Sequence, residues 1–118
     1  MIRNWSIRPN GTYYIELMRP LCVIPARRGS KRLALKNILP LGGRPMLAHT
    51  IEAAARSEIF DEVFVSTEDD EIAAIASAAG ASAHQRPQEL AGDLVSATDV
   101  CIELEQVLRE QGRHYDAI

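Results

Sequence analysis

The fold is decided by the stretch Leu21-Cys22-Val23-Ile24-Pro25-Ala26-Arg27-Arg28-Gly29-Ser30-Lys31-Arg32. Its first half is a short apolar run, which is typical of a strand covered on both faces of a parallel sheet. Its second half is small, polar and cationic, and it contains a glycine and a hydroxyl group. Backbone N–H groups, a hydroxyl donor and fixed positive charges are what a protein needs to hold a polyphosphate. The stretch therefore predicts a buried strand that opens into an anion-binding loop.

The positive charge of this region is local. Residues 17–51 contain seven Lys or Arg residues and no Asp or Glu, although the whole chain of 118 residues carries a net charge of −3. A basic island in an acidic protein indicates an anionic small ligand and argues against a generally basic nucleic-acid-binding protein.

Helical and strand patterns alternate after the cationic loop. We expect a helix that starts at Pro45, a strand over 63–66, a helix over 71–79 ended by Gly80, a strand over 81–84, a helix from Ser96 or Thr98 to about Gly112, and the start of a strand over 115–118. Thr67 or Asp69 is the expected cap of the second helix. Such alternation implies a parallel sheet with right-handed crossovers.

Two of the expected helices have recognisable apolar faces. The first face is predicted to hold Met46, Leu47, Thr50, Ile51 and Ala54, and the face of the last helix is predicted to hold Val100, Cys101, Leu104, Val107 and Leu108.

Residues 1–17 differ from the rest of the chain. Asn10-Gly11 is a turn signal, and residues 12–17 have the composition of a short strand. We interpret 1–17 as an N-terminal extension without a catalytic part, with an added edge strand as the alternative. Residues 18–118 are then the nucleotide-binding part.

Bulk composition is that of one soluble globular domain, with 47% hydrophobic and 25% charged residues. No apolar run approaches the roughly 18–20 residues of a membrane span, so we expect a cytoplasmic protein without membrane contacts. Cys22 and Cys101 sit in apolar contexts and are interpreted as reduced core thiols that lack a group to activate them.

Two candidate sites for a metal or for nucleophilic catalysis are set aside. The acidic run 68–71 fits the first turn of a helix, where carboxylates complement the helix dipole, better than a cation site. His49, His84 and His114 share no spacing that would indicate a zinc site or a catalytic triad.

Four motifs in this chain resemble those of one enzyme family. They are Pro25-Ala26-Arg27-x-Gly29-Ser30-Lys31 with Lys36-Asn37, Leu41-Gly42-Gly43-Arg44-Pro45-Met46, Phe60-Asp61-Glu62-Val63-x-Val65-Ser66-Thr67, and Arg86-Pro87-x-Glu89-Leu90-Ala91-x-Asp93. Their order and spacing resemble the acylneuraminate cytidylyltransferases, also called CMP-sialic acid synthetases. The resemblance covers roughly residues 20–100. It implies a Rossmann-like nucleotidyltransferase fold, with a mainly parallel sheet and helices on both faces.

The resemblance also implies a reaction. Members of the acylneuraminate cytidylyltransferase family transfer CMP from CTP to a nonulosonic (sialic-type) acid, release pyrophosphate and form a CMP-sugar. It implies Mg²⁺ as cofactor, with ligands outside this chain, so no metal ligand is named here. It implies a homodimer for a full-length protein. The family continues well beyond the last residue of this sequence, so the chain looks like the N-terminal half of such an enzyme.

The site residues follow from the same resemblance. Arg27 and Lys36 are the expected catalytic residues, because a guanidinium fork and an ammonium charge can neutralise phosphoryl oxygens. The expected contacts to CTP are Arg27, Gly29, Ser30, Lys31, Lys36, Asn37, Arg86 and, as an additional candidate, Ser96. Arg86 follows the third strand and is expected to direct its guanidinium or its backbone groups at the pyrimidine edge.

Two other interpretations stay open at this point. One is a truncated, non-catalytic fragment that binds CTP. The other is a cytidylyltransferase for another sugar acid, such as 3-deoxy-octulosonate, although Lys36-Asn37 and Arg86-Pro87 favour the nonulosonate enzymes. The sequence does not identify the sugar acid.

Overall fold

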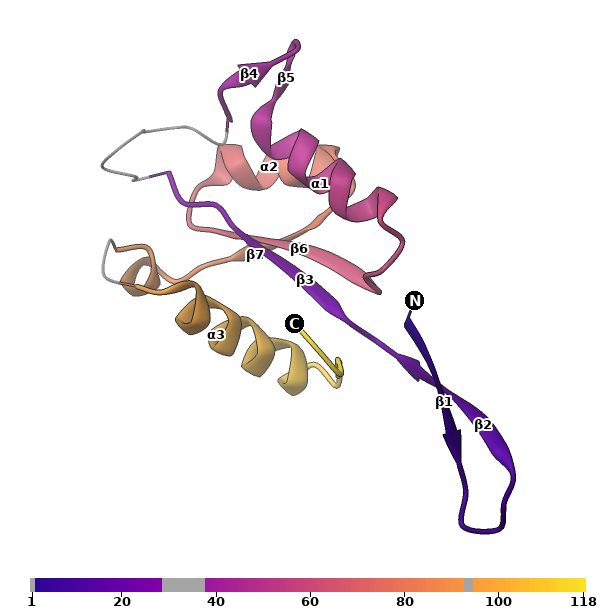
Figure 1. Cartoon of the computed structure of the whole chain (residues 1–118). Helices are drawn as coiled ribbons and strands as arrows, with labels where there is room; N and C mark the ends of the chain where they lie inside the picture. The colour runs from indigo at the N-terminus through magenta and orange to yellow at the C-terminus, as the bar shows by residue number, and fades with distance from the viewer. Residues whose placement is uncertain (1, 29–37, 93–94) are drawn as a thin grey trace.

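A three-stranded parallel sheet organises the chain. The computed structural model describes residues 2–28, 38–92 and 95–118. The sheet has the order β3-β6-β7, and its strands are β3 (Leu21–Pro25), β6 (Glu62–Thr67) and β7 (Ser82–Gln85). Both strand pairs are parallel. All three strands lie within two residues of the predicted bounds, and the predicted α/β class with a parallel sheet is confirmed (Figure 1).

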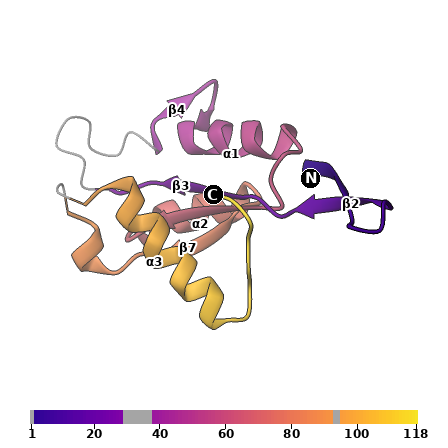
Figure 2. The same ribbon diagram turned by 60° about the horizontal axis from the view of Figure 1, so that its bottom comes forward.

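Helices cover both faces of this sheet. Helices α1 (Met46–Arg56) and α2 (Asp70–Ala78) lie on one face, and α3 (Ala97–Glu110) lies on the other (Figures 1 and 2). Successive residues of a strand point to opposite faces. Accordingly, Val65 packs with α1 and α2, whereas Phe64 packs with α3. The two hydrophobic clusters are thus separated by the sheet.

The helix ends agree with the signals in the sequence. Asp69 caps α2 by accepting a hydrogen bond of 2.9 Å from the backbone N–H of Ile72. Ser96 caps α3. Gly80 and Gly112 follow the two helices with φ of +96° and +76°, a conformation that costs glycine little.

The predicted apolar face of α1 is partly wrong. The buried residues are Leu47, Ala48 and Ile51, whereas Met46 is 43% exposed and Thr50 is exposed. The helix follows a short hairpin formed by β4 (Pro40–Leu41) and β5 (Arg44–Pro45), and its first backbone N–H binds the carbonyl oxygen of Leu39. The hairpin and this hydrogen bond determine how α1 starts, and the first residue of the helix, Met46, lies outside its buried face.

The predicted face of α3 is confirmed in its centre. Val100, Leu104 and Leu108 are buried, and Cys101 and Val107 flank them in half-buried positions. Cys22 and Cys101 are free thiols, and burial raises the pKa of both. Neither thiol is therefore activated as a nucleophile.

The N-terminal segment forms a hairpin of its own. Strands β1 (Ile2–Ile7) and β2 (Tyr13–Met18) pair antiparallel around the predicted turn, where Gly11 has a φ of +89°. The hairpin forms a separate two-stranded sheet and projects from the body of the molecule (Figure 1). The alternative of an added edge strand on the main sheet is therefore wrong, and β1 had not been predicted.

The C-terminal residues lie beside β3. Ala117 forms an isolated parallel bridge with Pro20, and its carbonyl oxygen accepts a hydrogen bond of 2.7 Å from Leu21. This bridge agrees with the predicted start of a strand over 115–118. In the described ranges, no helix has the length and apolar character needed to cross a membrane.

Candidate functional site

The candidate site lies at the edge of the sheet where β3, β6 and β7 end. Helices α2 and α3 begin at this same edge (Figure 1). In open parallel sheets ligands bind at this edge. The structure places Arg27, Arg86 and Ser96 here. The other predicted contacts, Gly29, Ser30, Lys31, Lys36 and Asn37, lie outside the described residues.

Arg27 is held at this edge by the residue before it. Ala26 is fully buried, and its backbone N–H donates a hydrogen bond of 3.0 Å to the carbonyl oxygen of Ser66. Arg27 itself is half-buried. It lies close enough to Arg86 to lower the pKa of that guanidinium. The end of β3 therefore places one of the predicted catalytic cations within electrostatic range of the predicted cytosine contact.

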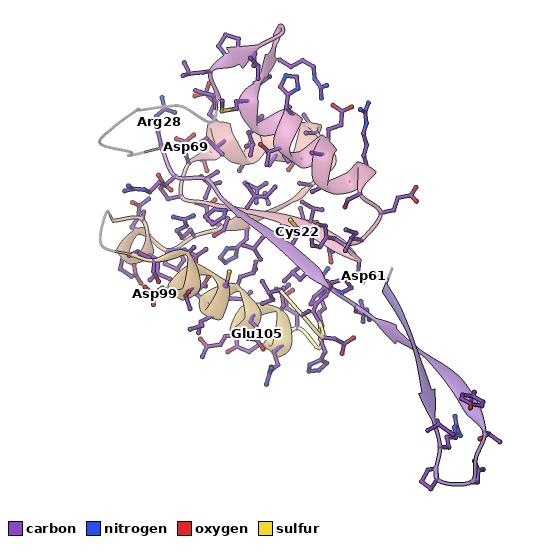
Figure 3. All side chains as sticks on the ribbon, viewed as in Figure 1. Cys22, Arg28, Asp61, Asp69, Asp99 and Glu105 are labelled. Carbon is purple, nitrogen blue, oxygen red and sulfur yellow. The ribbon has the colours of Figure 1, made fainter. Side chains whose placement is uncertain are left out.

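Arg28 joins the end of β3 to the start of α2. Its backbone N–H donates to Oε1 of Glu68 over 2.7 Å, and its guanidinium binds Asp69 at 3.1 Å and Glu71 at 2.9 Å. Figure 3 shows Arg28 and Asp69 side by side, shortly after the end of β3. The acidic run that had been set aside as a metal site is thus occupied by an arginine.

Arg86 is buried at the end of β7, with 4% exposure. Its backbone N–H donates to the carbonyl oxygen of Thr67 over 2.8 Å. Its guanidinium donates to Oγ of Ser66 at 3.3 Å, to the carbonyl oxygen of Ser66 at 2.8 Å and to that of Leu90 at 3.4 Å. The guanidinium is thus anchored to the protein, and the contact to a pyrimidine stays a prediction.

A polar chain continues from Arg86 under the edge of the sheet. Ser66 is fully buried, and its Oγ lies 2.9 Å from Nδ1 of His84. Nε2 of the same ring lies 2.8 Å from a carboxylate oxygen of Glu103 on α3. We call Arg86, Ser66, His84 and Glu103 together the Arg86 relay. It connects helix α3 to the end of the sheet.

Charges of both signs meet at this edge. Burial lowers the pKa of Arg86 and Arg27 lowers it further, whereas Glu68 and Glu103 oppose this shift. Oε2 of Glu68 and Oε2 of Glu103 are both buried and have no hydrogen-bond partner among the residues that the structure describes, so the 2.8 Å approach of Glu103 to His84 is a close polar contact without good hydrogen-bond geometry. Arg86 remains a cation, because a guanidinium is not deprotonated in proteins.

Ser96 has a structural role in the described part of the chain. Its Oγ donates to Oδ2 of Asp99 over 2.8 Å and accepts from the backbone N–H of Asp99 over 3.1 Å. These bonds form the capping box of α3 and lower the pKa of Asp99. Contact between Ser96 and CTP remains a prediction.

Sequence reasoning missed the Arg86 relay. His84 had been set aside because it shares no spacing with the other histidines. The available signal was weaker: residues 66 and 84 both lie near the ends of predicted strands. In the structure Ser66 and His84 are paired in the register of β6 and β7, which brings their side chains to the same face.

The buried ring of His84 makes the fold sensitive to acid. Burial is the main cause that lowers the pKa of His84 from its ordinary value of 6.5; Glu103 opposes the shift and Arg86 adds to it. Between pH 6.5 and the lower pKa of the folded state, the unfolded chain therefore binds more protons than the folded chain. The stability that the neutral ring provides is complete above pH 6.5. It is lost as the pH falls from 6.5 through the lower pKa that His84 has in the folded chain.

We expect this loss to appear in a comparison with His84→Asn. Urea unfolding at about pH 7.5 and about pH 5.5 should show a larger fall in the free energy of unfolding for the wild type, by at most about 1.4 kcal/mol per pH unit for one proton. Equal falls in the two proteins would contradict the assignment.

The described residues do not provide a metal site. Among them, no group of three His, Cys, Asp or Glu side chains is placed to hold a metal ion.

Comparison with known proteins connects this edge to one group of enzymes. A sequence model described as "Cytidylyltransferase" matches residues 21–112. A pseudaminic acid cytidylyltransferase from Campylobacter jejuni is 42% identical over 102 residues, which are 86% of this chain and 44% of the relative. An N-acylneuraminate cytidylyltransferase from Escherichia coli O18:K1:H7 is 49% identical over 77 residues, 65% of this chain and 18% of the relative.

A solved structure also matches. It is CMP:2-keto-3-deoxy-manno-octonic acid synthetase in complex with CTP, with a TM-score of 0.61, 34% identity, and coverage of 78% of this chain and 35% of that one. The match confirms the expected Rossmann-like nucleotidyltransferase fold. The chain spans less than half the length of the curated relatives it matches.

Proposed function

Because this chain belongs to the cytidylyltransferase family, we propose that it binds CTP at the edge formed by β3, β6 and β7, and that it acts there in the transfer of CMP to a nonulosonic acid. The observation that carries the proposal is that Arg27 and Arg86, from two separate family motifs, each follow a strand that ends at this edge and lie within electrostatic range of each other. Two cations at the carboxyl ends of parallel strands suit a nucleotide triphosphate.

The chemistry asks for positioning and charge neutralisation. A hydroxyl oxygen of the sugar acid forms a bond to the α-phosphorus of CTP, the bond from that phosphorus to the bridging oxygen breaks, and pyrophosphate leaves while the hydroxyl loses its proton. Such transfers depend on oriented cations near the phosphoryl oxygens. We assign this work to Arg27 and Lys36, and further phosphate contacts to Gly29, Ser30, Lys31 and Asn37. Mg²⁺, a cytoplasmic location and a homodimer of the full-length protein belong to the same proposal.

A nonulosonic acid is the favoured acceptor. Relatives named for pseudaminic, N-acylneuraminic and N,N'-diacetyllegionaminic acid are 41–49% identical to this chain, whereas the octonic acid synthetase is 34% identical. 3-Deoxy-octulosonate is therefore the second candidate acceptor.

Titration calorimetry with CTP and GTP, followed by an assay of pyrophosphate release with each sugar acid and Mg²⁺, tests the proposal. We expect CTP to bind more tightly than GTP, and pyrophosphate to appear with a nonulosonic acid. Binding of CTP without pyrophosphate release would support the non-catalytic alternative for this chain. No binding of CTP would overturn the proposal.

A further inference from the structure

The Arg86 relay has a defined direction of hydrogen bonding. Glu103 ends the relay with a carboxylate, which in its ionised form only accepts hydrogen bonds. Nε2 of His84 lies 2.8 Å from this carboxylate in a contact without good hydrogen-bond geometry, and since two unprotonated acceptors would repel at that distance, we place the proton of the ring on Nε2. A neutral ring leaves Nδ1 as an acceptor, so the hydroxyl group of Ser66 donates to it over 2.9 Å.

The arginine completes the sequence of donors. Once the single proton of the Ser66 hydroxyl points at His84, the lone pairs of Oγ are available to Nε–H of Arg86 at 3.3 Å. The two hydrogen bonds of the relay then run from donor to acceptor in one direction, from the guanidinium through Ser66 to the ring, and the ring's remaining N–H lies beside the carboxylate. Hydrogen bonds that align in this way strengthen one another in a buried environment.

We propose that His84 and Glu103 are positioning residues that fix the Arg86 guanidinium at the nucleotide site through Ser66. This inference rests on the proposed function, because it assumes that Arg86 contributes to CTP binding. The reason is geometric: the ring reaches from β7 to α3, so docking of the helix sets the side-chain torsion of Ser66, and Ser66 in turn orients Arg86.

Ser66, His84 and Glu103 of the relay do not form a nucleophilic triad. A serine nucleophile needs an exposed Oγ that can reach a substrate. Ser66 has no exposed surface, and its Oγ is already in contact with both Nδ1 of His84 and Nε of Arg86. The arrangement of Ser66, His84 and Glu103 therefore serves to orient Arg86.

The test compares three variants with the wild type. His84→Leu removes both polar contacts of the ring. His84→Asn retains an amide oxygen near the position of Nδ1, which can still accept from Ser66. His114→Leu is the matched control, because His114 is exposed and lies after α3, away from the relay. CTP affinity is measured by calorimetry, and unfolding by urea confirms that each variant is folded.

We expect His84→Leu to weaken CTP binding about tenfold, the effect of one lost buried hydrogen bond. His84→Asn should bind CTP with an affinity between those of the wild type and His84→Leu, since it retains an acceptor for Ser66 but loses the contact with Glu103. His114→Leu should match the wild type. If the wild type binds CTP and a folded His84→Leu variant binds equally well, the positioning role is overturned while the proposed function stands. If the wild type does not bind CTP, the proposed function fails and the positioning role fails with it.

Nuclear magnetic resonance tests the relay without a nucleotide, and it also covers the case in which His84→Leu does not fold. The ¹⁵N shifts of the His84 ring at neutral pH should show the neutral tautomer protonated at Nε2. Nε–H of Arg86 should exchange slowly with water, and Glu103→Gln should accelerate this exchange by removing the charge that ends the relay. A proton on Nδ1, or an unchanged exchange rate in Glu103→Gln, would overturn the inference.

Discussion

Replacement of Arg27 by alanine is expected to weaken CTP binding about 10–100-fold, which corresponds to the loss of one charge-assisted hydrogen bond in a desolvated site. Arg27 directly follows the buried Ala26, so the backbone of β3 determines where its cation lies. It is half-buried and lies within electrostatic range of the buried Arg86, in a position where its guanidinium could bind a phosphate oxygen. Titration calorimetry at low ionic strength measures the effect.

Arg56→Ala is the matched control for this experiment. Arg56 ends α1, its side chain is 79% exposed, and its guanidinium pairs with Glu52 at 2.6 Å, far along the chain from the site. The control removes the same charge and should leave CTP affinity unchanged. Affinity of the wild type should also fall with added salt more steeply than affinity of Arg27→Ala. Equal affinities of Arg27→Ala and Arg56→Ala would remove Arg27 from the site.

The second large effect concerns stability. Arg86→Met is expected to lower the free energy of unfolding by about 3–5 kcal/mol, because removing one partner of a buried polar network leaves the others unsatisfied. The carbonyl oxygens of Ser66 and Leu90 lose their bonds to the guanidinium, and Glu103 loses a nearby positive charge. Domains are stable by only about 5–15 kcal/mol, so a large share of the total is at stake.

Urea unfolding followed by circular dichroism measures this loss, with Arg109→Met as the control. Arg109 is exposed on α3 and pairs with Glu105 at 2.5 Å, a surface contact within one helix. Its replacement should change the free energy of unfolding by at most about 0.5 kcal/mol. If Arg86→Met were as stable as the control, the hydrogen bonds of the buried guanidinium would contribute nothing to the fold.

Elements defined by local patterns were predictable from the sequence. The apolar run of β3, the caps Asp69 and Ser96, and the glycines that end α2 and α3 each act through neighbouring residues, and the structure has all of them. The order of these elements was enough to predict a parallel sheet and the edge at which the site lies.

Features that depend on contacts between distant residues were not predictable. Ser66 and His84 meet because β6 and β7 pair in one particular register, and Glu103 joins them because α3 has one particular rotation. The rotation of α3 agrees with its predicted apolar face, but hydrophobic periodicity gives neither the register of β6 and β7 nor the approach of Glu103 to His84. The burial of the Arg86 guanidinium was missed for the same reason, since a strand end indicates where a side chain begins but not which groups surround it.

The separation of the two hydrophobic clusters by the sheet has a consequence for the order in which the chain folds. The cluster with α1 and α2 is built from residues 26–81, whereas the cluster on the other face needs Leu21 to meet Leu104 and Leu108. Closing a longer loop costs more entropy and slows folding. We therefore expect α1, β6 and α2 to assemble on β3 first, as an open two-layer intermediate, and α3 to dock last. Since α3 carries Glu103, the candidate site would be the last part of the molecule to reach its final geometry.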